Sequence, residues 1–304
     1  YYLVFPGFIF LAVAGGLFSW TDRKISAWVQ FRKGPPLLQP FYDFFKLLLV
    51  KETILPAHGS KLTFLFAPVF GLAGATLAGI LVLLPAFGIK PGFSGDIIVI
   101  FYVLTIPSLT YIIGALAAGN PLASVGASRE MKLVISYELT FLLAIAAIIY
   151  KAGMVTGLDG IISVQQSEGA FVGSISGVLL LIVIIFCIQA KLGFVPFDMP
   201  EAETEITHGC FIEYSGSAYS LIKLTKYMML FILPAFLCTV LLGGFRFDGF
   251  NILWSILKLV GVLLLITLIR NTNPRVRIDQ GMRFFLIWMN LLVIVAIILS
   301  YFNL

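Results

Sequence analysis

The sequence predicts an all-α integral membrane protein, a bundle of about eight transmembrane helices with one amphipathic helix on the cytoplasmic side. Of its 304 residues, 60% are apolar and only 12% are charged, and the mean hydropathy is +1.04. Soluble proteins carry about 25% charged residues, so a water-soluble globule is excluded. A disordered or nucleic-acid-binding chain is excluded on the same ground, despite the net charge of +5.

Apolar stretches long enough to cross a membrane recur along the whole chain. A spanning helix needs about 20 mostly apolar residues, and we predict eight spans at 1–20, 62–86, 97–118, 132–150, 173–194, 218–243, 250–270 and 284–303. The first lacks the basic start and the A-x-A cleavage pattern of a signal peptide. No linker or internal repeat divides the chain, which predicts a single polytopic membrane domain over residues 1–304.

Basic residues concentrate in alternate connections. The connection 21–61 carries seven of them, whereas the connections that hold Lys90, Lys151 and Arg246 carry one each. Positively charged loops stay in the cytoplasm, so we predict cytoplasmic loops at 21–61, 119–131, 195–217 and 271–283. Both chain termini are then expected outside, and the protein is expected in the cytoplasmic membrane.

A short amphipathic helix is predicted in the first cytoplasmic connection, at residues 37–50. Apolar residues recur there at helical spacing, and the polar residues Gln39, Asp43 and Lys46 lie on the other side. Such a helix is suited to the plane of the membrane interface. A short helix packed within the loop is the alternative.

Cysteine and histidine give no metal-binding pattern. The three cysteines, Cys187, Cys210 and Cys238, are widely spaced, and the two histidines are 150 residues apart. No zinc, iron–sulfur or nucleotide motif is present. We therefore expect no cofactor in this chain, and any redox metals belong to other subunits.

The connection after the fifth predicted span is unusually acidic. It carries five of the chain's 15 acidic residues: Asp198, Glu201, Glu203, Glu205 and Glu213. A helix starting near Glu201 would place Glu201 and Glu205 on one face. Crowding and burial raise carboxyl pKa values toward neutrality, so these groups are candidates for proton uptake and release. A solvated acidic loop, or a docking patch for a basic partner, is the alternative.

Ionisable residues also occur inside the predicted spans. Glu138 lies seven residues into the fourth span, Lys223 and Lys226 lie in the sixth, and Lys258 in the seventh. Such residues usually face a partner or a water-filled path, although Lys258 can also snorkel. A buried Glu138 beside an acidic connection suggests a proton path from the cytoplasmic side into the bundle.

Four blocks of sequence resemble one family. They are FRKGPPLLQPFYDFFKLLLVKE (31–52), GASREMKLVISYE (126–138), LGFVPFDMPEAETEITHGCFIEYSGS (192–217) and RVRIDQGMRFF (275–285). Together they resemble the subunit 1 family of respiratory complex I, which also includes the membrane subunits of energy-converting [NiFe] hydrogenases. The resemblance covers about residues 20 to 290, and eight spans is the family's number.

The residues in these blocks resemble the hydrogenase-type, ferredoxin-linked branch of the family more than the quinone-linked branch. Quinone-linked members typically read GPNRVGP where this chain has KGPPLLQP, and AETNRAPFDLPE where it has QAKLGFVPFDMPE. This resemblance does not exclude a close relative that reduces sulfur compounds instead of protons, because the metal-bearing subunit decides that chemistry.

The resemblance implies a membrane anchor and coupling subunit that is not catalytic by itself. The expected partners are hydrogenase-like large and small subunits with the NiFe centre and iron–sulfur clusters, a ferredoxin-like subunit, and antiporter-like membrane subunits. It implies a glutamate-lined path for H⁺ or Na⁺ through Glu138 and the five acidic residues named above. It gives Arg32, Arg129 and Arg275 a role in docking or loop ordering.

Three other functions remain open at this point. The chain could be the quinone-site subunit of a complex I-type dehydrogenase, a free-standing ion-coupled secondary transporter, or a structural anchor only. The sequence does not distinguish H⁺ from Na⁺, because carboxylates serve both ions. It identifies neither the electron donor nor the terminal acceptor.

Overall fold

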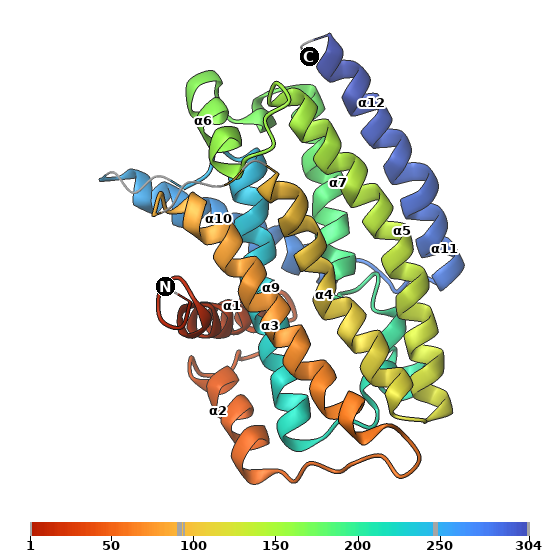
Figure 1. Cartoon of the computed structure of the whole chain (residues 1–304). Helices are drawn as coiled ribbons and strands as arrows, with labels where there is room; N and C mark the ends of the chain where they lie inside the picture. The colour runs from red at the N-terminus through yellow and green to blue at the C-terminus, as the bar shows by residue number, and fades with distance from the viewer. Residues whose placement is uncertain (1, 90–92, 94, 246–248, 303–304) are drawn as a thin grey trace.

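The computed structural model describes the chain except residues 1, 90–92, 94, 246–248 and 303–304, and of residues 203 and 204 it describes only the backbone. Lys90 and Arg246, which entered the prediction of membrane orientation, therefore lie outside the described residues. All regular secondary structure in the described residues is helical, so the predicted all-α fold is confirmed. The α-helices (Figure 1) are α1 Phe8–Val29, α2 Gln39–Phe45, α3 Lys61–Ala86, α4 Asp96–Ala117, α5 Pro121–Lys151, α6 Leu158–Glu168, α7 Ile175–Lys191, α8 Glu203–Ile206, α9 Gly216–Leu241, α10 Asn251–Thr272, α11 Ile278–Arg283 and α12 Asn290–Tyr301.

Six helical segments of the described chain are long and apolar enough to cross a membrane. They are α3, α4, α5, α9, α10 and the continuous segment Ile278–Tyr301, in which a π-helical turn, Phe284–Met289, joins α11 to α12. The fifth predicted span corresponds to α7, which is apolar but shorter, with 17 residues. The predicted count of eight spans stays a prediction.

The first predicted span is shifted along the chain. The helix α1 begins at Phe8 rather than at residue 1, and it continues to Val29. Its C-terminal part carries Asp22, Arg23 and Lys24, and α1 is not among the six long apolar segments. Its polar end is held by specific partners, described below.

Two predicted connections are largely helical. The loop expected at 119–131 is the start of α5, because Asn120 caps the helix through a hydrogen bond from Leu122 N to its Oδ1 (2.9 Å) and Pro121 suits the first helical position. The connection after α5 contains α6. The amphipathic helix expected at 37–50 is divided into α2 and a π-helical turn, Lys46–Val50.

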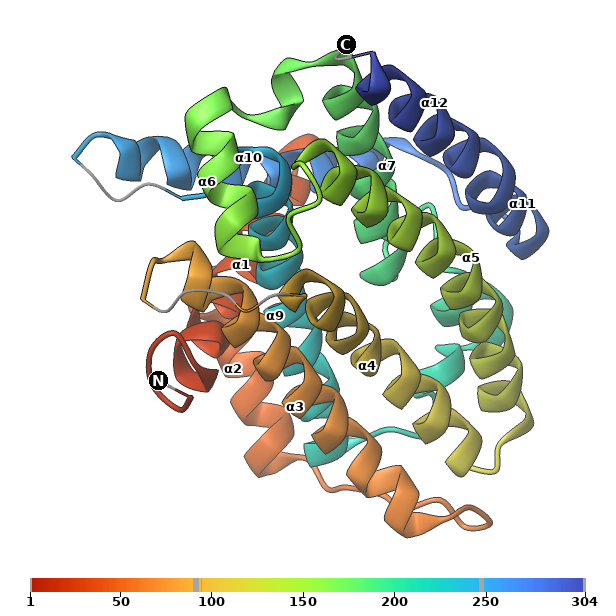
Figure 2. The ribbon, with the colours of Figure 1, turned by 45° about the horizontal axis from the view of Figure 1, so that its top comes forward.

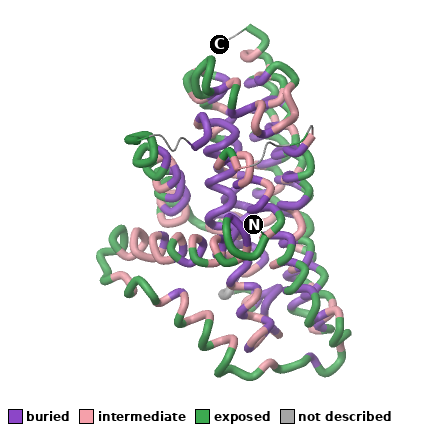
Figure 3. The backbone as a smooth tube through the Cα atoms, turned by 60° about the vertical axis from the view of Figure 1, so that its left-hand side comes forward, coloured by how far each residue is buried: buried purple, intermediate pink, exposed green. Residues whose placement is uncertain are grey.

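The helix α9 forms the centre of the bundle. In its apolar window 89% of the residues are buried, and α1, α3, α6, α7 and α10 pack around it. Figures 1 and 2 show α3, α4 and α5 side by side in front of α9, and Figure 3 shows the buried backbone concentrated along the middle of the bundle.

Small residues let α1 cross close to α9. A Cβ on Gly15 would lie 2.5 Å from the carbonyl oxygen of Tyr227, so only glycine permits this approach. Small residues serve the same purpose in many membrane helix contacts. The crossing brings the charged end of α1 near the start of α9 and the end of α10.

Candidate functional site

The acidic loop, residues 195–217, folds against the ends of α5, α9 and α11. The prediction of a helix that starts near Glu201 is wrong. The loop contains two 3₁₀ turns, Met199–Glu201 and Gly209–Phe211, separated by the four-residue α8. Thr207 and His208 have φ values of 43° and 79°, which end the helix because this region suits glycine rather than larger residues. Glu201 and Glu205 therefore do not share a helical face.

Each described carboxylate of the loop is tied to a different element. Asp198 pairs with Arg275 (Oδ2–Nε 2.8 Å), and Glu201 pairs with Lys226 of α9 (Oε1–Nζ 2.6 Å). Glu205 pairs with Arg129 of α5 at 2.5 Å, and its side chain is 59% exposed.

Two further acidic residues complete the loop. Glu213 accepts a hydrogen bond from the side-chain amide of Asn120 at 2.5 Å, before the start of α5. The backbone of Glu203 begins α8, but its side chain lies outside the described part of the structure. The contacts of the described carboxylates hold the loop in one shape rather than leaving it as a solvated acidic segment.

Asp198 is the most buried described carboxylate of the loop. Its Oδ1 has no hydrogen-bond partner among the described residues. Burial raises the pKa of Asp198, and the guanidinium of Arg275 offsets this rise only in part. The sequence-based expectation that some carboxyl pKa values rise therefore applies to this residue.

Glu138 lies inside the bundle on α5 and forms an ion pair with Lys191 at the end of α7, with 2.5 Å between Oε1 and Nζ. The side chain of Lys191 is 1% exposed and that of Glu138 is 13% exposed. The ammonium also lies within 5.3–5.9 Å of the ring centroids of Phe101, Tyr137 and Phe141, a distance at which aromatic faces stabilise cations. The second carboxylate oxygen of Glu138 has no described partner.

A small cavity lies between the acidic loop and this buried ion pair. Its volume is about 20 Å³, and its charged lining residues are Glu130, Lys191, Glu201 and Lys226. That volume is enough for about one water molecule. Because Lys191 both lines the cavity and holds Glu138, ionisable groups follow one another from the loop to the middle of α5.

Two members of this series were missed by the sequence reasoning. The predicted topology puts Glu130 in the loop 119–131 and Lys191 near the end of the span 173–194, and it gives neither residue a role. The Asn120–Pro121 pair was the available signal, because it places the helix start before Glu130. With α5 starting there, Glu130 and Glu138 are eight residues apart on one helix, about two turns.

The three arginines with an expected docking role differ in their surroundings. Arg129 and Arg275 form the ion pairs with the acidic loop given above. Arg32 is exposed in the segment that follows α1. The structure thus places two of the three against the loop and one at the surface.

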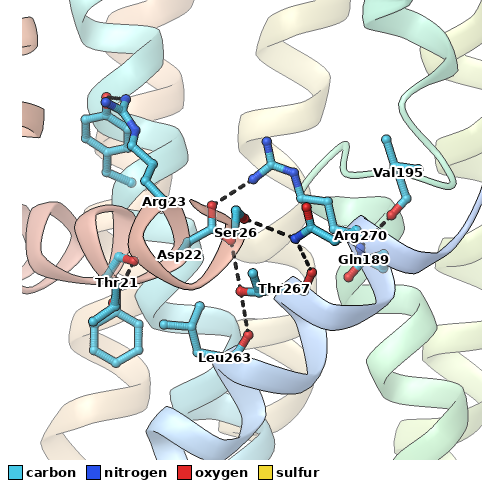
Figure 4. Close-up of polar contacts among 12 residues, drawn as sticks. Thr21, Asp22, Arg23, Ser26, Gln189, Val195, Leu263, Thr267 and Arg270 are labelled. Carbon is cyan, nitrogen blue, oxygen red and sulfur yellow. Dashed lines mark hydrogen bonds and ion pairs between the residues drawn. The ribbon is translucent and has the colours of Figure 1, made fainter. Parts of the chain in front are cut away.

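The charged end of α1 lies between two sets of partners (Figure 4). Asp22 accepts hydrogen bonds from Arg270 (2.7 Å) and Thr267 (2.9 Å) of α10, and the Arg270 guanidinium lies 4.4 Å from the ring centroid of Phe194. Arg23 points to the other side of α1, where it pairs with Asp43 of α2 at 2.9 Å.

Asp43 is held in its charged form. Burial pushes its pKa upward, but hydrogen bonds from Arg23 and Gln39 outweigh this, so the pKa of Asp43 lies below its usual value. Arg23 also donates to the Tyr227 hydroxyl at 2.9 Å. These contacts attach α2 to α1 and α9.

An apolar cavity of about 450 Å³ lies beside this attachment, between α1, α2 and α9. Phe8, Val13, Phe41, Phe44 and Leu224 are among its lining residues. Its size is in the range of pockets that take small organic ligands.

The described side chains contain no group of three or more His, Cys, Asp or Glu positioned to hold a metal ion. The three cysteines are buried and unpaired. Ion pairs and hydrogen bonds account for the contacts that the described acidic residues of the loop make.

Comparison with known proteins gives consistent results over nearly the whole chain. The sequence model of the NADH dehydrogenase family matches residues 2–301. The chain is 34% identical to the H subunit of the NADH-quinone oxidoreductase of Thermomicrobium roseum, over 92% of this chain and 89% of the relative. It is 31% identical to the corresponding subunit of Brevibacillus brevis, over 99% and 94% of the two chains.

The fold also matches a chain in the solved structure of the membrane-bound sulfane sulfur reductase, an archaeal respiratory membrane complex. The TM-score is 0.86 at 26% sequence identity, and the match covers 96% of both chains. Sequence and structure therefore agree on a membrane subunit of the kind found in respiratory complexes.

Proposed function

This chain belongs to the NADH dehydrogenase family of complex I-like membrane subunits, and from this membership we propose that it couples electron transfer in a docked soluble arm to ion translocation. The arm is of the ferredoxin-linked, hydrogenase type, with its NiFe centre and iron–sulfur clusters in partner subunits. Antiporter-like membrane subunits beside this chain complete the ion path. The acidic loop lies on the cytoplasmic side, and both termini lie outside.

The observation that supports this proposal most is the cavity between Glu201 and the Glu138–Lys191 pair. It brings a loop carboxylate and two α5 carboxylates into one series. A path for protons needs ionisable groups or water at each step, and here the separation is bridged by space for about one water.

The charges around the cavity support a proton as the ion at this step. Three carboxylates, Glu130, Glu138 and Glu201, face two ammonium groups, Lys191 and Lys226. If all are ionised, one negative charge is left over, and an uncompensated charge is costly away from water. A proton on one carboxyl group removes the excess, whereas a hard metal cation needs several oxygen ligands at once, and two of the three carboxylates already bind lysine ammonium groups. The proposal is therefore H⁺ transfer at this step.

Glu130 is the group that holds this proton. Glu138 and Glu201 each have a lysine partner, whereas the described residues offer the Glu130 carboxyl group no ion pair. A movement of the acidic loop that separates Glu201 from Lys226 leaves a positive charge beside Glu130. That charge favours release of the proton toward Glu138, which links loop position to proton transfer.

The remaining residues of the acidic loop act on its position. The contacts of Asp198 and Glu205 with Arg275 and Arg129 order the loop beneath the docked arm, and Arg32 contributes to docking. Glu203 and Glu213 belong to the same acidic entrance. The partner subunit that carries the metals sets the terminal acceptor, and the likeness to a sulfane sulfur reductase subunit supports sulfur compounds as well as protons for that role.

The test measures electron transfer and ion uptake together in inverted membrane vesicles. We expect Glu138→Gln and Glu201→Gln to keep most electron transfer and to reduce ion uptake by about tenfold or more, because a proton relay loses one member. Asp159→Asn, near the start of α6 at the other end of the bundle, is the matched control. Unchanged ion uptake in both variants would leave only the anchor function.

The apolar cavity favours a second candidate, a quinone-site subunit. Its volume of about 450 Å³ and its aromatic lining suit an isoprenoid chain. A photoreactive quinone analogue distinguishes the two: labelling of α1 or α2 that excess quinone prevents would support this candidate. Electron transfer that is independent of added quinone, with no labelling, would reject it.

A further inference from the structure

A larger cavity lies at the end of the bundle away from the acidic loop. It measures about 950 Å³ and is lined by the ends of α5 and α12 and by the segment before α7, including Lys151, Glu168, Phe171, Ser174 and Tyr301. Figures 1 and 2 show these helix ends together at the top of the molecule, near the C-terminus. None of these residues belongs to the proposed proton path.

Lys151 is the basic residue in the lining of this cavity. Its ammonium donates to the hydroxyls of Ser174 and Ser176, the latter at 2.5 Å, and lies 5.9 Å from the ring centroid of Phe171. The residues that the structure describes provide no ion-pair partner for it. Neutral hydroxyls orient the ammonium but leave its charge unbalanced, so an anion in the cavity is favoured.

The position of the cavity indicates where such an anion comes from. The apolar helices α5 and α12 end here, and Tyr150 and Tyr301 are exposed at these ends, as is usual where helices leave the hydrocarbon core. Ile175, Val178 and Ile182 of α7 are 60%, 42% and 39% exposed, and their spacing forms one apolar stripe that starts beside Ser174. A lipid headgroup lies at this level, with its acyl chains alongside such a stripe.

We propose that this cavity binds the headgroup of a phosphodiester lipid. Lys151, with Ser174 and Ser176, receives the phosphate, and the acyl chains follow the stripe on α7. Glu168 lines the same cavity, so a headgroup that also carries an ammonium group fits better than a purely anionic one. The occupant is therefore of the phosphatidylethanolamine type.

The test uses the purified membrane complex, delipidated in detergent and then supplied with phosphatidylethanolamine, phosphatidylglycerol, diacylglycerol or inorganic phosphate. Native mass spectrometry counts the bound molecules. We expect retained phosphatidylethanolamine to fall about tenfold in Lys151→Met, the effect of losing one charge-assisted contact. Lys151→Arg should retain the lipid, as should Lys61→Met, which removes a charge at the other end of the bundle.

The wild-type complex alone can overturn the proposal. Equal retention of phosphatidylethanolamine and diacylglycerol would show that no phosphate site exists. Inorganic phosphate that displaces the lipid at micromolar concentration would show a free-phosphate site instead. Equal retention in Lys151→Met and wild type would exclude Lys151 as the anchor.

Discussion

The ion pair between Glu138 and Lys191 joins α5 and α7, which carry the inner part of the proposed path. The side chain of Lys191 is 1% exposed, and Glu138 is its one carboxylate partner among the described residues. A buried pair of this kind adds little net stability, yet removing one partner is costly because the other charge stays buried. The pair therefore limits the substitutions that the site tolerates. A change in the charge of Glu138 also changes how well the buried ammonium of Lys191 is stabilised.

We predict that Lys191→Met lowers the free energy of unfolding by about 3–5 kcal/mol, the usual cost of leaving a buried charge without its partner. The double substitution Lys191→Met with Glu138→Gln should recover part of this loss, because no charge is then left alone. Thermal unfolding of the purified protein in detergent measures both. A double variant as unstable as the sum of the single variants would mean that the two residues do not interact.

The charged C-terminal part of α1 connects three other helices, α2, α9 and α10. Asp22 fastens α1 to α10, and Arg270 in turn lies against Phe194 at the approach to the acidic loop. Arg23, the next residue, fastens α1 to α2 and α9. The apolar cavity and the acidic loop are thus connected through neighbouring residues of one helix.

The attachment of α2 should depend on pH. The pKa of Asp43 is lowered in the folded protein, so the pair contributes stability above the unfolded value of about 3.9 and loses it as the pH falls through the lower folded value. We expect hydrogen exchange in residues 39–50 to rise on acidification below about pH 4. The variant Asp43→Asn should exchange fast already at neutral pH. Slow exchange in this variant at pH 7 would show that the pair does not hold α2.

The composition and the length of the apolar stretches were enough to predict the helical membrane fold, because a chain that is 60% apolar has few other ways to fold. They did not reveal that α1 begins late and ends in a charged turn, since its charges are satisfied by contacts distant in sequence. The motif around PFDMPEAE located the acidic loop in the sequence. The backbone conformation of the loop depends on how it packs against the helices, which residue spacing does not reveal. A Cβ on Gly209 would clash with the carbonyl of Pro200, so the chain must fold back on itself there.

The candidate site also contains residues that the sequence could identify and residues that it could not. Glu138 was recognisable because a carboxylate within an apolar span is rare. Glu130 was not, because its role depends on α5 starting at Pro121 and on Lys226 and Glu201 approaching it from other parts of the chain. The sequence located individual charges, whereas their sum around one cavity required the structure.

The most direct test of the proposed path is the ratio of protons translocated to electrons transferred by the Glu130→Gln variant of the intact complex in inverted vesicles. We expect no contact between Glu130 and the redox arm, so electron transfer should continue in the variant. Proton translocation should fall about tenfold or more, because the relay loses one member. The proton translocation should not depend on the sodium concentration. The same ratio in Glu130→Gln and wild type would contradict the path through the cavity.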